Sequence, residues 1–120
     1  GLAEFDVTRE AYVPLEQLRR ENYQKWRQLM DSGWFSEADP AAFQDTGVDA
    51  FESIIANHPG QRVAVFCHAG VVNVWAARVL GIQRYLFFTP GYTSIHRFGA
   101  GRDGKRGVLS LNEQAHLRAV

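Results

Sequence analysis

Apolar residues recur at helical spacing in the first half of the chain. The segment from Pro14 to about Met30 has a patchy apolar face, and proline suits the first turn of a helix. The next segment begins with Asp39, a good N-cap, and Pro40, a residue favoured at the first helical position. Apolar residues then follow on one face until His58-Pro59-Gly60 ends the pattern. The pattern therefore predicts one helix over about 14–30 and a second over 40–57.

In the second half of the chain, apolar residues form continuous runs rather than one face at helical spacing. The run Arg62–Cys67 is apolar without polar alternation, which is typical of a central strand covered on both faces. A turn at 68–70 leads into 71–80, a segment apolar on nearly all sides, which predicts a mostly buried helix ending at Gly81. Segments 93–100 and 107–111 predict the strands of a hairpin around the turn residues 101–105. Helix, buried strand and helix in this order indicate a layered α/β domain.

Charge and composition restrict the classes of partner that we expect for this domain. The 13 basic and 13 acidic residues balance and form no basic run, so a nucleic-acid partner has little support. No apolar stretch is long enough to span a bilayer, and the first residues lack the pattern of a signal peptide, so we expect no membrane partner. Cys67 is the only cysteine, which excludes an internal disulfide and fits a cytoplasmic location.

The turn between the predicted strand and the buried helix carries the candidate chemistry. In open α/β sheets, ligands bind beyond the carboxyl ends of the strands, where a helix N-terminus offers N–H groups to an anion. His68 stands at this point and can bind phosphate oxygens or move protons. Ala69 and Gly70 after it keep the backbone approachable. The pattern therefore predicts an anion site with a histidine, and a purely structural His68 is the alternative.

Other chemistries at this turn lack their residues. A cysteine phosphatase loop built on Cys67 needs an arginine six residues later, and position 73 is asparagine. A serine hydrolase needs a serine at the turn, and none is present. The histidines lack the close spacing of a metal site, and no Gly-x-x-x-x-Gly-Lys loop for nucleotides occurs. We therefore expect neither a metal nor another cofactor.

Four segments, in this order along the chain, together resemble one protein family. They are the start Gly1–Asp6, the strand ending in His68-Ala69-Gly70 with its helix to Leu80-Gly81, the loop Phe88–Ile95 and the ending Leu111–Leu117. This set is similar to the histidine phosphatase superfamily, the phosphoglycerate-mutase-like proteins. The resemblance implies a three-layer α/β/α fold with a mainly parallel sheet and a closing hairpin. It also implies that residues 1–120 are the C-terminal portion of a single such domain.

The resemblance implies a mechanism as well. A first histidine attacks phosphorus and is then relieved by water or by an acceptor hydroxyl. His68, as the second histidine, neutralises the charge on the transferring phosphoryl group. Glu4 protonates the leaving alkoxide and later activates water. The expected partners are a small phosphorylated substrate or inorganic phosphate, and a homodimer is allowed for.

The chain departs from the family pattern in two places. It has no Arg-His-Gly nucleophile segment, so we expect it to be inactive alone, with the nucleophile upstream of Gly1. The missing initiator methionine favours this explanation over a natural pseudoenzyme. The residues Asp6–Glu10 lack the family's glycine-rich continuation, which leaves the substrate open. A phosphatase for small phosphate esters is the first hypothesis, and a phosphomutase or a non-catalytic phosphate-binding module are the alternatives.

Overall fold

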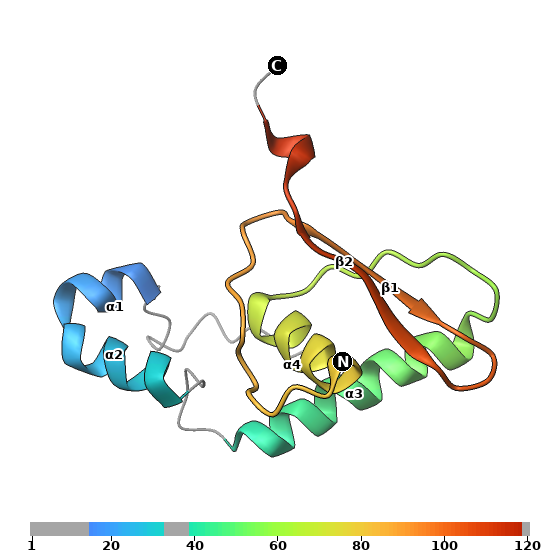
Figure 1. Cartoon of the computed structure of the whole chain (residues 1–120), viewed down its shortest axis with the longest axis horizontal. Helices are drawn as coiled ribbons and strands as arrows, with labels where there is room; N and C mark the ends of the chain where they lie inside the picture. The colour runs from blue at the N-terminus through green and yellow to red at the C-terminus, as the bar shows by residue number, and fades with distance from the viewer. Residues whose placement is uncertain (1–14, 33–38, 119–120) are drawn as a thin grey trace, which may run out of the picture.

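A computed structural model describes residues 15–32 and 39–118 as a mixed α/β structure. The elements, in chain order, are α1 (Leu15–Glu21), α2 (Tyr23–Ser32), α3 (Pro40–Asn57), α4 (Ala69–Leu80), β1 (Ile95–Ala100), β2 (Arg106–Glu113) and the 3-10 helix η1 (Ala115–Leu117). α3 and α4 pack together, the β1–β2 hairpin lies against α4, and α1 and α2 form a separate pair to one side (Figure 1).

The helix predicted over 14–30 is two helices. α1 ends at Glu21 and α2 begins at Tyr23, so the prediction of one continuous helix is wrong. Asn22 lies between them, and its side-chain oxygen accepts a hydrogen bond from the N–H of Lys25 at 3.1 Å. Asparagine competes in this way with the backbone of a helix interior and favours a cap. The break is therefore a local effect of one residue.

The predicted helix over 40–57 is confirmed as α3. Asp39 has an extended backbone, and its carboxylate accepts a hydrogen bond from the N–H of Ala41 at 3.0 Å. Pro40 follows as the first helical residue, and the helix ends at His58. The side-chain cap satisfies an N–H group that the helix itself leaves free.

The buried helix predicted over 71–80 is confirmed as α4, which begins two residues earlier, at Ala69. Gly81 ends it in the left-handed conformation, with φ of 70°. Trp75 lies at the centre of the core: its ring stacks on Phe51 of α3 at 5.0 Å and meets the edge of Phe98 of β1 at 6.2 Å. These rings join both helices and the hairpin. The buried apolar residues are Val48, Val72, Val74, Trp75, Ala76 and Ala77.

The prediction of a central strand over Arg62–Cys67 is wrong for this structure. The segment forms no strand, and Val63 and Phe66 are 45% and 89% exposed. A strand exists only through hydrogen bonds to a neighbour, whatever its sequence favours. In the described part of the chain, β1 and β2 pair only with each other, as a two-stranded antiparallel sheet. A mainly parallel sheet between two helical layers is therefore not observed in residues 15–32 and 39–118.

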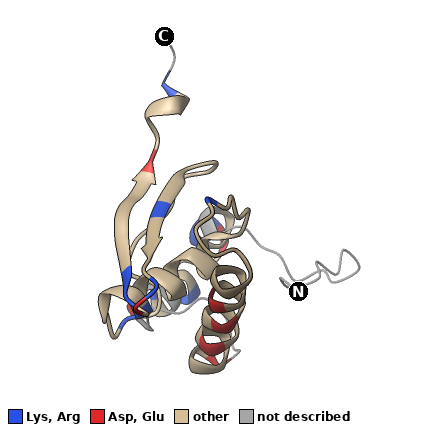
Figure 2. Ribbon diagram, turned by 90° about the vertical axis from the view of Figure 1, so that its right-hand side faces the viewer, with Lys and Arg blue, Asp and Glu red and all other residues tan. Residues whose placement is uncertain are grey.

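The predicted hairpin is confirmed. β1 pairs with β2 in antiparallel register, with Phe98 opposite Val108, and β2 continues to Glu113, beyond the predicted end at 111. Figure 2 shows acidic positions along α3 and basic positions near the hairpin turn. There the Arg106 guanidinium donates two hydrogen bonds to the Glu52 carboxylate, at 3.0 and 2.7 Å. This bidentate pair fastens the hairpin to α3.

Candidate functional site

His68 occupies the N-cap position of α4. Its backbone is extended, with φ of −96° and ψ of 163°, and its carbonyl accepts hydrogen bonds from the N–H groups of Val71 and Val72. The imidazole makes no capping hydrogen bond, and the residue is exposed. Backbone bonding thus fixes where His68 stands, and the ring is not used to hold the helix.

The first turn of α4 supplies the backbone groups of the site. Ala69 and Gly70 are its first two residues, and their N–H groups precede the first intrahelical hydrogen bonds. The positive end of the helix dipole adds to the attraction for an anion. The structure therefore brings His68, Ala69 and Gly70 together at one helix start. Glu4, the predicted proton donor, lies outside the described residues.

Cys67 precedes the site without contributing a nucleophile. The residue is exposed as a whole, yet partial burial of the sulfur raises the pKa of the Cys67 thiol above its ordinary value. A thiol with a raised pKa stays protonated at neutral pH, and the thiolate is the reactive form. This agrees with the rejection of a cysteine phosphatase loop.

Asn73 is a residue that the sequence pattern did not single out. It lies one turn into α4, is 2% exposed, and fastens the loop after α4 to that helix. Its Nδ2 donates to the carbonyls of Ala69 and Phe88, both at 3.0 Å, and its Oδ1 accepts from the N–H groups of Phe87 and Phe88. The available signal in the sequence is one asparagine among the apolar residues 69–77.

A second polar cluster holds the far end of the same loop. The N–H of Asn112 donates to Nδ1 of His96 at 2.9 Å, so the proton of the neutral ring is on Nε2. That Nε2–H faces the Ser94 hydroxyl at 3.0 Å, and the hydroxyl donates to the Gly91 carbonyl. The Asn112 amide oxygen closes the ring by accepting from the N–H of Gly91 at 2.8 Å. Burial lowers the pKa of His96, which favours this neutral form.

His116 anchors the loop from η1. Its Nε2 lies 2.7 Å from the carbonyl of Thr93, a residue with a left-handed φ of 55°. His116 therefore has a structural hydrogen bond, in keeping with the ending motif on which the family resemblance drew.

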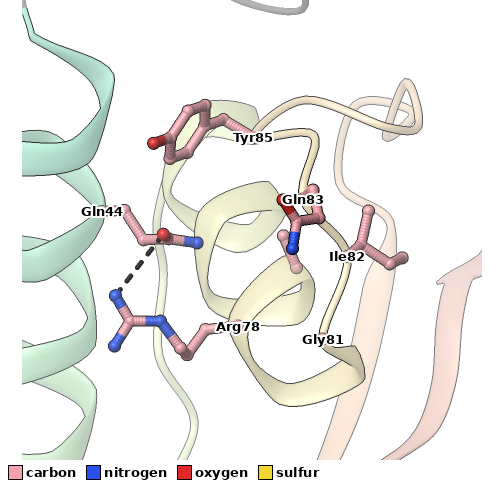
Figure 3. A pocket seen from close by; sticks show the side chains of 7 residues that line it. Gln44, Arg78, Gly81, Ile82, Gln83 and Tyr85 are labelled. Atoms are coloured by element: carbon pink, nitrogen blue, oxygen red, sulfur yellow. Dashed lines mark hydrogen bonds between the residues drawn. The ribbon is translucent and has the colours of Figure 1, made fainter.

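A shallow pocket of about 290 Å³ lies at the opposite end of α4 from His68 (Figure 3). Two of its polar side chains already pair with protein: Arg78 bonds to Asp45 at 2.9 Å, and the Gln44 amide donates to the carbonyl of Val74. The hollow therefore belongs to the α3–α4 contact. The lining residues are Gln44, Ala77, Arg78, Gly81, Ile82, Gln83 and Tyr85.

The described residues contain neither a metal-binding cluster nor a helix suited to spanning a membrane. No group of three or more His, Cys, Asp or Glu side chains in residues 15–32 and 39–118 is placed to hold a metal ion. Over the same part of the chain, no helix has the length and apolar character needed to cross a bilayer.

Comparison with known families supports the resemblance read from the sequence. Residues 1–114 match the family model of the histidine phosphatase superfamily (branch 1). Comparison with curated proteins and with solved structures returned no match. The family match spans nearly the whole chain, including Glu4 and the helix start at His68. The chain therefore belongs to the histidine phosphatase superfamily.

Proposed function

We propose that this chain is the C-terminal portion of a single phosphoglycerate-mutase-like domain that hydrolyses small phosphate esters through a phosphohistidine. The observation that carries the proposal is the exposed His68 at the start of α4, in a chain that matches the histidine phosphatase superfamily. The nucleophilic histidine lies upstream of Gly1 in this proposal, because the chain contains no Arg-His-Gly.

Each site residue has one role in the proposed reaction. His68 and the N–H groups of Ala69 and Gly70 bind the phosphoryl oxygens and stabilise the negative charge that develops during transfer. Glu4 protonates the leaving alkoxide and then takes a proton from the attacking water. In this proposal the phosphorylated histidine is the covalent intermediate, and protein groups rather than a metal ion neutralise the charge of the phosphoryl group.

The fold proposed for the complete domain is three-layer α/β/α with a mainly parallel sheet. The exposed apolar run Arg62–Cys67 supports it, because Val63 and Phe66 have the composition of a buried strand and here lie open to solvent. In the complete domain this run would pair within the sheet and place His68 at its edge. The free thiol of Cys67 is compatible with the cytoplasm as the proposed compartment.

The decisive experiment uses the complete natural protein that contains this chain. Hydrolysis of an aryl phosphate is measured with EDTA present, in the wild type and in His68→Ala. His58→Ala is the matched control, since His58 also stands exposed at a helix end, that of α3. We expect kcat/KM to fall on the order of a hundredfold or more in His68→Ala, the usual cost of losing a charge-stabilising donor. The control is expected to keep its activity.

Two results would redirect the proposal. An inert wild type that still binds phosphate indicates the non-catalytic binding module, or a mutase too selective for the aryl ester. An active His68→Ala variant removes His68 from the mechanism.

A further inference from the structure

Asn73 uses its full hydrogen-bonding capacity to join two parts of the chain. A carboxamide offers two N–H donors and two acceptor positions. Asn73 gives both donors to carbonyls, of Ala69 and Phe88, and accepts from the N–H groups of Phe87 and Phe88. Because only 2% of the Asn73 surface is exposed, these bonds take the place of hydrogen bonds to water almost completely. Losing them would leave partly buried backbone groups of Phe87 and Phe88 without these partners, which is unfavourable.

Through Asn73, the loop is joined to the first turn of α4, the turn that follows His68. Nδ2 of Asn73 lies between the carbonyl of Ala69, next to His68, and the carbonyl of Phe88. This single amide group thus sets the spacing between the first turn of α4 and the loop. The next anchor is at Gly91, whose N–H donates to the amide oxygen of Asn112 at 2.8 Å. Only Thr89 and Pro90 lie between the two anchors.

We propose that Asn73 is a positioning residue of the phosphate site: it holds the segment Thr89–Pro90 beside His68, as a wall that contacts the organic group of the ester. The inference rests on the proposed function for its substrate class. Thr89 is exposed and carries a hydroxyl, and Pro90 has a fixed φ and no N–H, so the held segment is short and stiff. Such a wall selects among esters by the size of the alcohol portion.

The test compares Asn73→Ala with Val74→Ala in the complete protein. Val74 is the next residue on α4 and is fully buried, so its truncation weakens the core without touching the loop bonds. Three quantities are measured where both variants stay folded: the ratio of kcat/KM for phenyl phosphate to that for naphthyl phosphate, the affinity for vanadate, and the hydrogen exchange of the Phe87 and Phe88 amides. The ratio does not depend on the active fraction, so a general loss of stability does not move it.

We expect Asn73→Ala to change the ester ratio at least fivefold and to release both amides to exchange, because the wall loses its anchor. Vanadate has no alcohol portion, so its affinity should stay within twofold of the wild type in Asn73→Ala. Val74→Ala should keep the ester ratio and the vanadate affinity within twofold of the wild type. An unchanged ester ratio in Asn73→Ala, or an equal change in Val74→Ala, overturns the inference. If the wild type binds vanadate but hydrolyses neither ester, the proposed phosphatase fails, and the relative affinities of the two esters, measured by competition with vanadate, decide the role of Asn73. A wild type that binds no vanadate overturns both.

Discussion

Gly47 allows α3 to lie close against α4. A Cβ atom added at Gly47 would lie 3.3 Å from Cγ2 of Val74, closer than the usual separation of two carbon atoms. Val74 is 0% exposed and β-branched, so its methyl group has little freedom to move away. Gly47→Ala therefore brings a favourable helix term and an unfavourable packing term into conflict.

The two terms can be compared from known magnitudes. Glycine inside a helix costs about 0.5–1 kcal/mol relative to alanine. Extra atoms in a well-packed core cost about 1–3 kcal/mol. The packing cost is the larger of the two terms, so we expect Gly47→Ala to lower the free energy of unfolding by about 1 kcal/mol. In a Val74→Ala background Cγ2 is absent, so the same change should raise it by about 0.5–1 kcal/mol.

Urea unfolding of the complete protein measures this reversal, provided that the m value stays constant across the variants. The exposed position Ser53 in α3 supplies the calibration, because Ser53→Ala and Ser53→Gly differ mainly in helix propensity. If Gly47→Ala stabilises the wild type by as much as the alanine–glycine difference at Ser53, the close approach of the helices is refuted. Equal effects of Gly47→Ala in both backgrounds would refute it too.

Two further predictions concern one backbone position and one titrating group. Gly81 has φ of +70° and open space around it, so Gly81→Ala should lower the free energy of unfolding by about 1–2 kcal/mol through backbone strain alone. Gly99 also has open space around it but no positive φ, so Gly99→Ala should cost clearly less in the same urea assay. Because burial lowers the pKa of His96, its neutral form contributes stability above about pH 6.5 that is lost as the pH falls through the folded-state pKa. The urea midpoint from pH 8 to 5 should therefore fall more steeply in the wild type than in His96→Gln, and parallel curves would contradict this.

Features decided by neighbouring residues could be predicted from the sequence. The start of α3 follows from Asp39 and Pro40, and the end of α4 follows from Gly81, because caps depend on residues next to each other in the chain. The hairpin follows from its turn residues in the same way. His68 with Ala69 and Gly70 is equally local, which is why the sequence could predict a helix start at the proposed anion site.

Features decided by distant residues could not be predicted. The sequence identified Arg62–Cys67 as apolar, but a strand also needs a partner, and the described residues offer none. The break at Asn22 is an exception, because it is local and yet was not predicted: one polar residue leaves the apolar pattern around it unchanged. The lowered pKa of His96 was not predictable either, because it comes from burial of the ring, which only the folded chain produces.

The difference between local and long-range contacts also applies to the two parts of the proposed site, which are phosphoryl binding and the choice among esters. Binding of a phosphoryl group needs only charge and N–H groups at a helix start, so one short segment around His68 can provide it. Choice among esters needs a surface at a fixed distance from that segment, and a chain can fix such a distance only through contacts between remote positions. Asn73 with Phe88 and Asn112 with Gly91 are contacts of this kind. Substitutions that change the preferred ester should therefore concentrate at these anchors and at Thr89 and Pro90, whereas substitutions around His68 should weaken all esters alike.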